Sequence, residues 1–138
     1  MSRPDPGTLP AAPGAYALEI RLARTLKLPV AALGLPRLRP GRYVYLGSAR
    51  GPGGLRARVG RHLKAGKIER WHVDHLTARA GVAAVVSRAG SSECAMVRAL
   101  LAAPGVGVPV AGFGSSDCRD CPAHLLLVPE GLDLEAAL

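Results

Sequence analysis

The 138-residue sequence contains no run of 18 or more apolar residues, so it offers no candidate for a helix that crosses a membrane. It also lacks the start of a signal peptide, because residues 1–6 lead into further proline and glycine instead of an apolar segment. No internal repeat is visible. These absences lead us to expect a cytoplasmic protein, in which the three cysteines would stay reduced.

Acidic residues are few, with 10 Asp and Glu against 18 Lys and Arg. Residues 37–70, called the basic segment below, hold ten of those 18 cations and one acid, Glu69. This segment alone accounts for the net charge of +8. A positive patch confined to one segment indicates a polyphosphate partner, and we predict nucleic acid. The candidate contacts are Arg42, Arg50, Arg56, Arg58, Arg61, Lys64 and Lys67.

A hydrophobic fraction of 49% with 20% charged residues is typical of one globular domain, expected over residues 14–129. Four prolines predict a flexible tail over residues 1–13, and residues 130–138 are interpreted as a second tail. Alternating side chains over 14–22 predict a half-buried strand, followed after a proline-interrupted connection by an antiparallel strand over 41–47. The later segments predict helices over 55–64, 71–77 and 93–102 and strands over 82–87 and 124–128. The predicted class is α/β of the α+β kind, with a small, mainly antiparallel sheet and flanking helices.

Glu93 is the acid that stands out. On its expected helix it shares a face with the apolar residues Met96 and Leu100, so its carboxylate projects from the inward side. A buried carboxylate without a partner is costly, so pairing or metal binding is one interpretation. The alternative is that Glu93 stabilises the start of its own helix, where acids are favoured.

Arg58 and His62 lie one turn apart on the expected basic helix, with Arg61 beside them. A guanidinium next to an imidazole can clamp a phosphate, and the imidazole can move a proton near neutral pH. The alternative is a solvated basic face that touches only backbone phosphates. Tyr16 and Tyr45 stand on the two expected strands, where a tyrosine by itself more often packs than reacts.

Residues 14–16 (Gly-Ala-Tyr) and 45–47 (Tyr-Leu-Gly) resemble the two signature tripeptides of the GIY-YIG nuclease superfamily, each with one aliphatic substitution. Arg58 and His62 match the Arg and His that this superfamily carries on the helix after the second motif. Glu93 stands where the superfamily places its metal-binding acid.

Residues 71–76 (Trp-His-Val-Asp-His-Leu) and 112–125 resemble the DUF123 branch of the superfamily, so that the likeness spans nearly the whole chain. Two features depart from the pattern. Tyr16 and Tyr45 are 29 positions apart, more than the short hairpin of the superfamily needs. The late asparagine of many members has no obvious match.

The resemblance implies a metal-dependent endonuclease in which Glu93 holds one Mg²⁺ or Mn²⁺. Tyr16 would orient or deprotonate the attacking water, and Tyr45 would position the water or the phosphate. Arg58 would neutralise charge on the phosphate in the transition state.

Two histidines, His62 and His72, are implied as candidates for the base or for a phosphate ligand. Gly47 is counted among the nucleic-acid contacts, because it would let the backbone turn close to the site. Asp74 is expected to orient a nearby His or Arg.

The cysteines form a separate candidate site. Cys118 and Cys121, with His124 three residues further on, have the local spacing of half a zinc site, and Cys94 could supply a fourth ligand. The alternative is three small, buried, reduced cysteines beside a core strand.

The predicted function is hydrolysis of nucleic-acid phosphodiester bonds, with DNA the favoured substrate, in repair or processing. No helix-turn-helix or complete zinc finger is visible, so we expect recognition of DNA structure, or targeting by a protein partner. The alternative is a non-catalytic nucleic-acid-binding module, stabilised by zinc in one version.

Overall fold

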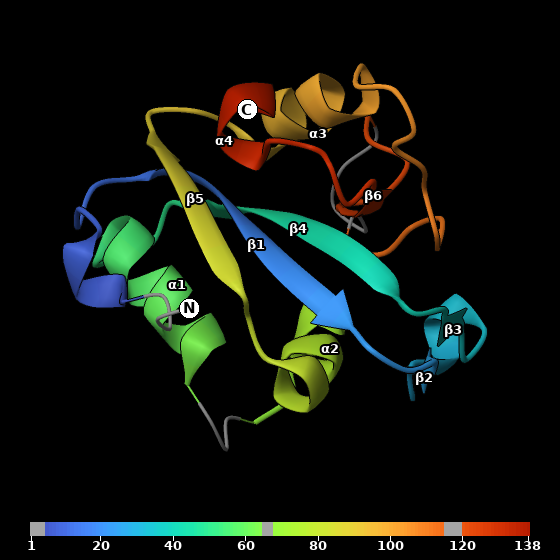
Figure 1. The fold of residues 1–138 in the computed structure, drawn as a ribbon. Helices are drawn as coiled ribbons and strands as arrows, with labels where there is room; N and C mark the ends of the chain where they lie inside the picture. The colour runs from blue at the N-terminus through green and yellow to red at the C-terminus, as the bar shows by residue number, and fades with distance from the viewer. Residues whose placement is uncertain (1–4, 65–67, 115–119) are drawn as a thin grey trace.

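Figure 1 shows the fold in a computed structural model that describes residues 5–64, 68–114 and 120–138. The main sheet is antiparallel, with strands in the order β5–β1–β4–β6. The strands span Gly14–Leu22 (β1), Gly41–Ala49 (β4), Ala84–Ala89 (β5) and Leu125–Val128 (β6). The α-helices span Gly54–Leu63 (α1), His72–Ala80 (α2), Glu93–Leu101 (α3) and Leu134–Ala137 (α4). The predicted α+β class with a small antiparallel sheet and flanking helices is confirmed. None of the helices in the described ranges is both long and apolar enough to span a bilayer.

The central strand β1 serves two apolar layers. Its residues Tyr16, Leu18 and Ile20 pack with apolar residues of α1 and α2, on one side of the sheet (Figure 1). Ala15 and Ala17 point the other way and pack with apolar residues of α3 and α4. The strand predicted as half-buried is therefore buried on both faces, because small alanines leave room for a second helical layer.

The long connection between β1 and β4 has structure of its own. Two short strands, Leu26–Lys27 (β2) and Arg37–Leu38 (β3), pair antiparallel around a 3₁₀ turn at Ala31–Leu33 (η2). This excursion lengthens the sequence between the two motif tyrosines. It leaves the β1–β4 register intact, with Tyr16 opposite Gly47.

The segment before β1 differs from the flexible tail that its composition predicts. It forms a 3₁₀ turn at Pro6–Thr8 (η1), and its backbone then runs along the start of α1. The carbonyls of Pro10 and Ala12 accept hydrogen bonds from the N–H groups of Arg56 and Leu55, at 3.1 and 2.9 Å. Such N–H groups have no partner within their own helix, so this segment caps α1.

The C-terminal residues are also packed, contrary to the expected second tail. The side chain of Asp133 caps α4, and Leu134 is buried in the layer beneath α3. The composition of both ends therefore understates how much of the chain belongs to the fold.

Arg42 is an internal residue of the sheet. Only 6% exposed, it forms an ion pair with Glu19 at 2.6 Å. Its guanidinium also donates to the carbonyls of Pro129 and Leu132, at 3.0 and 2.6 Å, and so ties the C-terminal segment to the sheet. The prediction that Arg42 contacts nucleic acid is wrong, because its charge is used inside the fold.

Candidate active site

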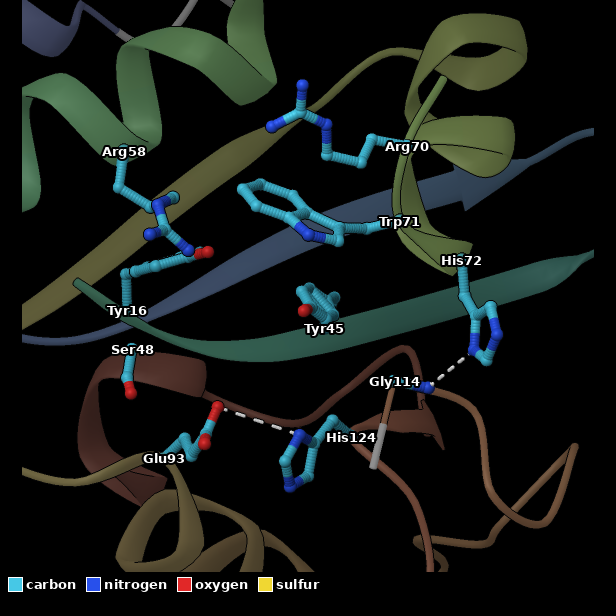
Figure 2. Close-up of a pocket in the computed structure, with 10 residues that line it drawn as sticks. All are labelled: Tyr16, Tyr45, Ser48, Arg58, Arg70, Trp71, His72, Glu93, Gly114 and His124. Atoms are coloured by element: carbon cyan, nitrogen blue, oxygen red, sulfur yellow. Dashed lines mark hydrogen bonds and ion pairs between the residues drawn. The ribbon is translucent and has the colours of Figure 1, made fainter. Parts of the chain in front are cut away.

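A cavity of about 360 Å³ lies where the central strands meet the starts of α2 and α3 and one face of α1 (Figure 2). It brings together five residues singled out in the sequence as catalytic candidates and adds Arg70, Ser48 and Gly114, which sequence reasoning missed as site residues. The lining residues are Tyr16, Tyr45, Ser48, Arg58, Arg70, Trp71, His72, Glu93, Gly114 and His124. Arg70 could have been found from its place in the basic segment, directly before the motif-like residues 71–76. Gly114 lies within the motif-like residues 112–125, and Ser48 directly follows the second tripeptide.

Tyr16 reaches the cavity by lying across the neighbouring strand at Gly47. A Cβ at Gly47 would stand 2.4 Å from the hydroxyl oxygen and from the Cζ atom of Tyr16. Any side chain there would collide with the ring, which is 1% exposed and closely packed. The expected role of Gly47 as a nucleic-acid contact is therefore corrected: its missing side chain is the space that the Tyr16 ring occupies.

His62 lies behind Tyr16. Its Nε2 atom is 2.6 Å from the Tyr16 hydroxyl oxygen, and its ring also packs against Tyr45 and Trp71. The imidazole is 2% exposed and is not among the residues that line the cavity. The expectation that His62 contacts phosphate directly is therefore corrected, because Tyr16 lies between His62 and the cavity.

Both tyrosines of the cavity are held as neutral phenols. Burial, then the neighbouring Tyr45, raises the pKa of Tyr16 far above its ordinary value, against the opposing charge of Arg58. Burial, then the charge of Glu93, raises the pKa of Tyr45 as well. At neutral pH the two side chains can therefore donate or accept hydrogen bonds, but they do not carry charge.

Trp71 forms one wall of the cavity and carries two guanidinium groups. The Cζ atom of Arg58 lies 4.7 Å from its ring centroid, and that of Arg61 lies 4.1 Å from it. Stacking of this kind holds the cations in place. Arg58 lines the cavity with its guanidinium beside Tyr16 (Figure 2), whereas Arg61 is engaged elsewhere.

Asp74 organises this wall from within the protein. Its fully buried carboxylate accepts two hydrogen bonds from Arg61, both at 2.8 Å, and two more from the backbone N–H groups of Arg70 and Trp71. Burial alone would raise the pKa of Asp74, but these hydrogen bonds outweigh it and hold the pKa well below its usual range. The prediction that Asp74 orients a nearby Arg is confirmed. Arg61, predicted to contact phosphate, is instead a structural partner.

His72 lines the cavity from the first turn of α2. Its Nδ1 atom accepts a hydrogen bond from the N–H of Gly114 at 3.0 Å, so the ring ties the loop before β6 to α2. Burial, then the neighbouring His75, lowers the pKa of His72. With Nδ1 accepting, the neutral ring carries its proton on Nε2.

Glu93 enters the cavity from the first residue of α3. The cap of this helix is Ser92, whose Oγ atom accepts a hydrogen bond from the N–H of Ala95 at 3.1 Å. The Glu93 carboxylate is 29% exposed, and its Oε2 atom lies 3.6 Å from Nδ1 of His124. Because the Ser92 side chain caps the helix, the Glu93 carboxylate is not used for capping and lines the cavity instead.

Three metal-ligating side chains meet beside Glu93. The ligand atoms of Cys94, Cys121 and His124, called the Cys–His cluster below, all lie within 4.8 Å of one another. Cys118, which the sequence groups with them, lies outside the described residues. Neither ring nitrogen of the buried His124 has a hydrogen-bond partner among the described residues, an arrangement that costs about 1–3 kcal/mol unless something else binds the ring.

The remaining residues predicted to contact phosphate differ in their surroundings. Arg56 is exposed, but it donates to the carbonyl of Leu9 at 2.9 Å and so fastens the segment before β1. Arg50 and Lys64 are exposed. Lys67 lies outside the described residues.

The fold and the site define an α+β domain whose cavity gathers two tyrosines, two arginines and one carboxylate. The model of a family described as domain of unknown function DUF123 matches residues 15–138. The chain belongs to this family. No curated protein matches the chain, and no solved structure does so either.

We expect Gly47→Ala to lower the free energy of unfolding by about 1–3 kcal/mol, because its methyl group must displace the packed Tyr16 ring. Gly51→Ala is the matched control: a Cβ there meets nothing within 4 Å, and the change should stay within about 0.5 kcal/mol. Urea unfolding measures both. In a Tyr16→Leu background the penalty of Gly47→Ala should shrink, and an unchanged penalty would contradict the contact.

Asp74→Asn should lower the free energy of unfolding at neutral pH by about 1.5–3 kcal/mol, since it weakens the hydrogen bonds with Arg61. The pKa of Asp74 is depressed in the folded state, so its stabilisation is complete above about pH 4 and fades as the pH falls through the folded pKa. Urea unfolding between about pH 5 and pH 2.5 should therefore show wild type and variant converging. A difference that stays constant over this range would refute the account. Glu135→Gln, at an exposed acid, is the control.

Proposed function

We propose that this protein is a metal-dependent endonuclease with a GIY-YIG-type site. The observation that supports the proposal is that four candidate catalytic residues converge on one cavity. Tyr16, Tyr45, Arg58 and Glu93 come from four different elements and line one cavity. A cavity with a carboxylate facing cations across two neutral phenols suits a phosphodiester, which needs a metal on one side and positive charge on the other.

Glu93 fits a Mg²⁺ or Mn²⁺ ion. Both ions prefer oxygen ligands and are commonly held by one or two carboxylates, with water and substrate phosphate completing the coordination. The Glu93 carboxylate is partly exposed and faces the cavity, which leaves room for those other ligands. When bound, the ion would neutralise charge on the phosphate and polarise a water molecule.

Arg58 and Arg70 would hold the phosphate from the opposite side. Arg58 is stacked on Trp71, so its guanidinium is oriented before the substrate arrives. Arg70 is exposed and lines the cavity, and its backbone is fixed by Asp74. Guanidinium groups suit this task because they offer paired donors to phosphate oxygens.

Tyr16 and His62 would move the proton of the attacking water. In the His62 tautomer with its proton on Nδ1, Nε2 accepts a hydrogen bond from the Tyr16 hydroxyl. As the water attacks phosphorus, its proton passes to the Tyr16 oxygen while the Tyr16 proton passes to Nε2. Tyr16 thus stays neutral throughout, in keeping with its raised pKa. The relay uses His62 as the final proton acceptor, although it does not line the cavity.

The substrate is proposed to be DNA recognised by its structure. The cations around the cavity, Arg58 and Arg70, address backbone phosphates and carry no base code. Trp71 favours a splayed or single-stranded region, since an indole at the cavity wall can stack on an unpaired base. A targeting protein partner would then direct where the enzyme acts.

The second candidate is a non-catalytic nucleic-acid-binding module. The observation that favours it is Trp71 at the cavity wall, with the guanidinium groups of Arg58 and Arg61 over its ring. Such a module has no use for a carboxylate that faces the phosphate site. Catalysis therefore explains more of the cavity than binding does.

The test is a cleavage time course on labelled duplex, single-stranded, flapped and abasic DNA and on matched RNA, with Mg²⁺, Mn²⁺ or EDTA. We expect metal-dependent cutting that falls by about 100-fold or more in Glu93→Gln and in Arg58→Ala. Glu135→Gln and Arg98→Ala, both at exposed positions away from the cavity, are the matched controls and should cut like wild type.

Cutting that survives Glu93→Gln would refute the site. Tight, salt-sensitive binding without cutting under every condition would favour the binding module instead.

A further inference from the structure

The Cys–His cluster lies directly beside the cavity but is not explained by phosphodiester hydrolysis. Cys94 is the second residue of α3, and Cys121 and His124 stand just before β6. Of the three, only His124 lines the cavity. We infer that Cys94, Cys121 and His124 bind a Zn²⁺ ion that fastens the segment before β6 to the start of α3.

The spacing of the donors suits zinc. Tetrahedral coordination with Zn–S bonds of about 2.3 Å and Zn–N bonds of about 2.0 Å places ligand atoms roughly 3.5–3.8 Å apart. The three ligand atoms already lie within 4.8 Å of one another, so small side-chain rotations bring them to these spacings. A fourth ligand would complete the tetrahedron. Two thiolates with one imidazole form a donor set that zinc prefers over magnesium.

Apolar packing alone does not explain why His124 is buried in this cluster. Small buried thiols can pack as hydrophobic groups, but a buried imidazole needs partners for its nitrogens. The ring is 2% exposed, and neither nitrogen has a hydrogen-bond partner within the described ranges. Nδ1 faces Glu93 at 3.6 Å, and the other nitrogen points away from that carboxylate (Figure 2). A zinc ion on Nε2 would satisfy the ring.

Backbone hydrogen bonds hold the residues around the Cys–His cluster in place. The N–H of His124 donates to the carbonyl of Phe113 at 2.7 Å, and the carbonyl of His124 accepts from the N–H of Leu46 at 2.8 Å. The N–H of Gly112 donates to the carbonyl of Pro122 at 2.8 Å. These bonds fix the segment before β6 to β4 and to the residues around Phe113.

Zinc on Nε2 would leave the Nδ1–H of His124 as a donor to Glu93. Histidine ligands of zinc usually pass their second N–H to a carboxylate, which sets the orientation of both groups. This part of the inference rests on the proposed nuclease function, because it makes His124 a positioning residue for the acid that holds the catalytic ion. The zinc site itself stands without it.

The first test is metal content, measured on full-length protein purified without added zinc. We expect about one equivalent of zinc per chain, removable only by strong chelators. Replacement by Co²⁺ should give the intense thiolate-to-cobalt absorption of a tetrahedral site containing sulfur. This readout uses wild-type protein, so it does not depend on whether a variant folds. Protein that lacks zinc, takes up none and gives no such band with Co²⁺ would overturn the inference.

Variants then assign the ligands. Cys121→Ser and His124→Gln should lower zinc affinity by at least about tenfold, whereas His75→Gln, at a histidine paired with Glu69, should leave it unchanged. Undiminished affinity in His124→Gln would overturn the assignment.

Glu93→Gln separates the two proposals. It should keep the zinc while losing cleavage, so a failed nuclease assay leaves the zinc result standing. Loss of zinc in Glu93→Gln would show that Glu93 is itself a ligand and would refute a site formed by Cys94, Cys121 and His124 alone.

Discussion

The crossing of the Tyr16 ring over Gly47 is the contact on which the site depends. It requires β1 and β4 to pair in one register, because a shift of one residue would turn Tyr16 to the opposite layer. With the register set, the hydroxyl of Tyr16 meets His62 on α1. The rings of Tyr45 and Trp71 pack against His62, and Phe113 packs against Tyr45. The core and the cavity therefore depend on the same contacts. The aromatic packing that stabilises the sheet also orients the Tyr16 hydroxyl.

Charge is divided between two tasks in this protein. Arg42 and Arg61 are held by the buried acids Glu19 and Asp74 and stabilise the fold. Arg58, by contrast, lines the cavity, and aromatic stacking orients it without neutralising it. Phosphate recognition needs a guanidinium that is held in one orientation while its positive charge is not neutralised by an acid. Asp74 thus affects the site indirectly. It holds the backbone of Trp71, and Arg58 stacks on the Trp71 ring.

Much of this arrangement could be predicted from the sequence, for identifiable reasons. The strands and helices follow from hydrophobic periodicity, and Tyr16, Tyr45, Arg58 and Glu93 follow from motif spacing. The errors concern partners that lie far apart in the chain. The cation of Arg42 counts toward a basic surface until Glu19, from another strand, is seen to bury it. The segment before β1 looks unstructured by composition, because its stability comes from capping N–H groups of α1. His62 looks like a direct phosphate ligand because the sequence gives its helical face but not its depth.

A crystal structure of the protein soaked with Mn²⁺ and a short single-stranded DNA, with anomalous data at the manganese edge, would locate the metal and the phosphate relative to Glu93 and Arg58. We expect a manganese peak within coordination distance of the Glu93 carboxylate. We also expect a DNA phosphate between that peak and the guanidinium of Arg58, with the Tyr16 hydroxyl facing the phosphorus. DNA bound on another face, with no manganese in the cavity, would contradict this arrangement.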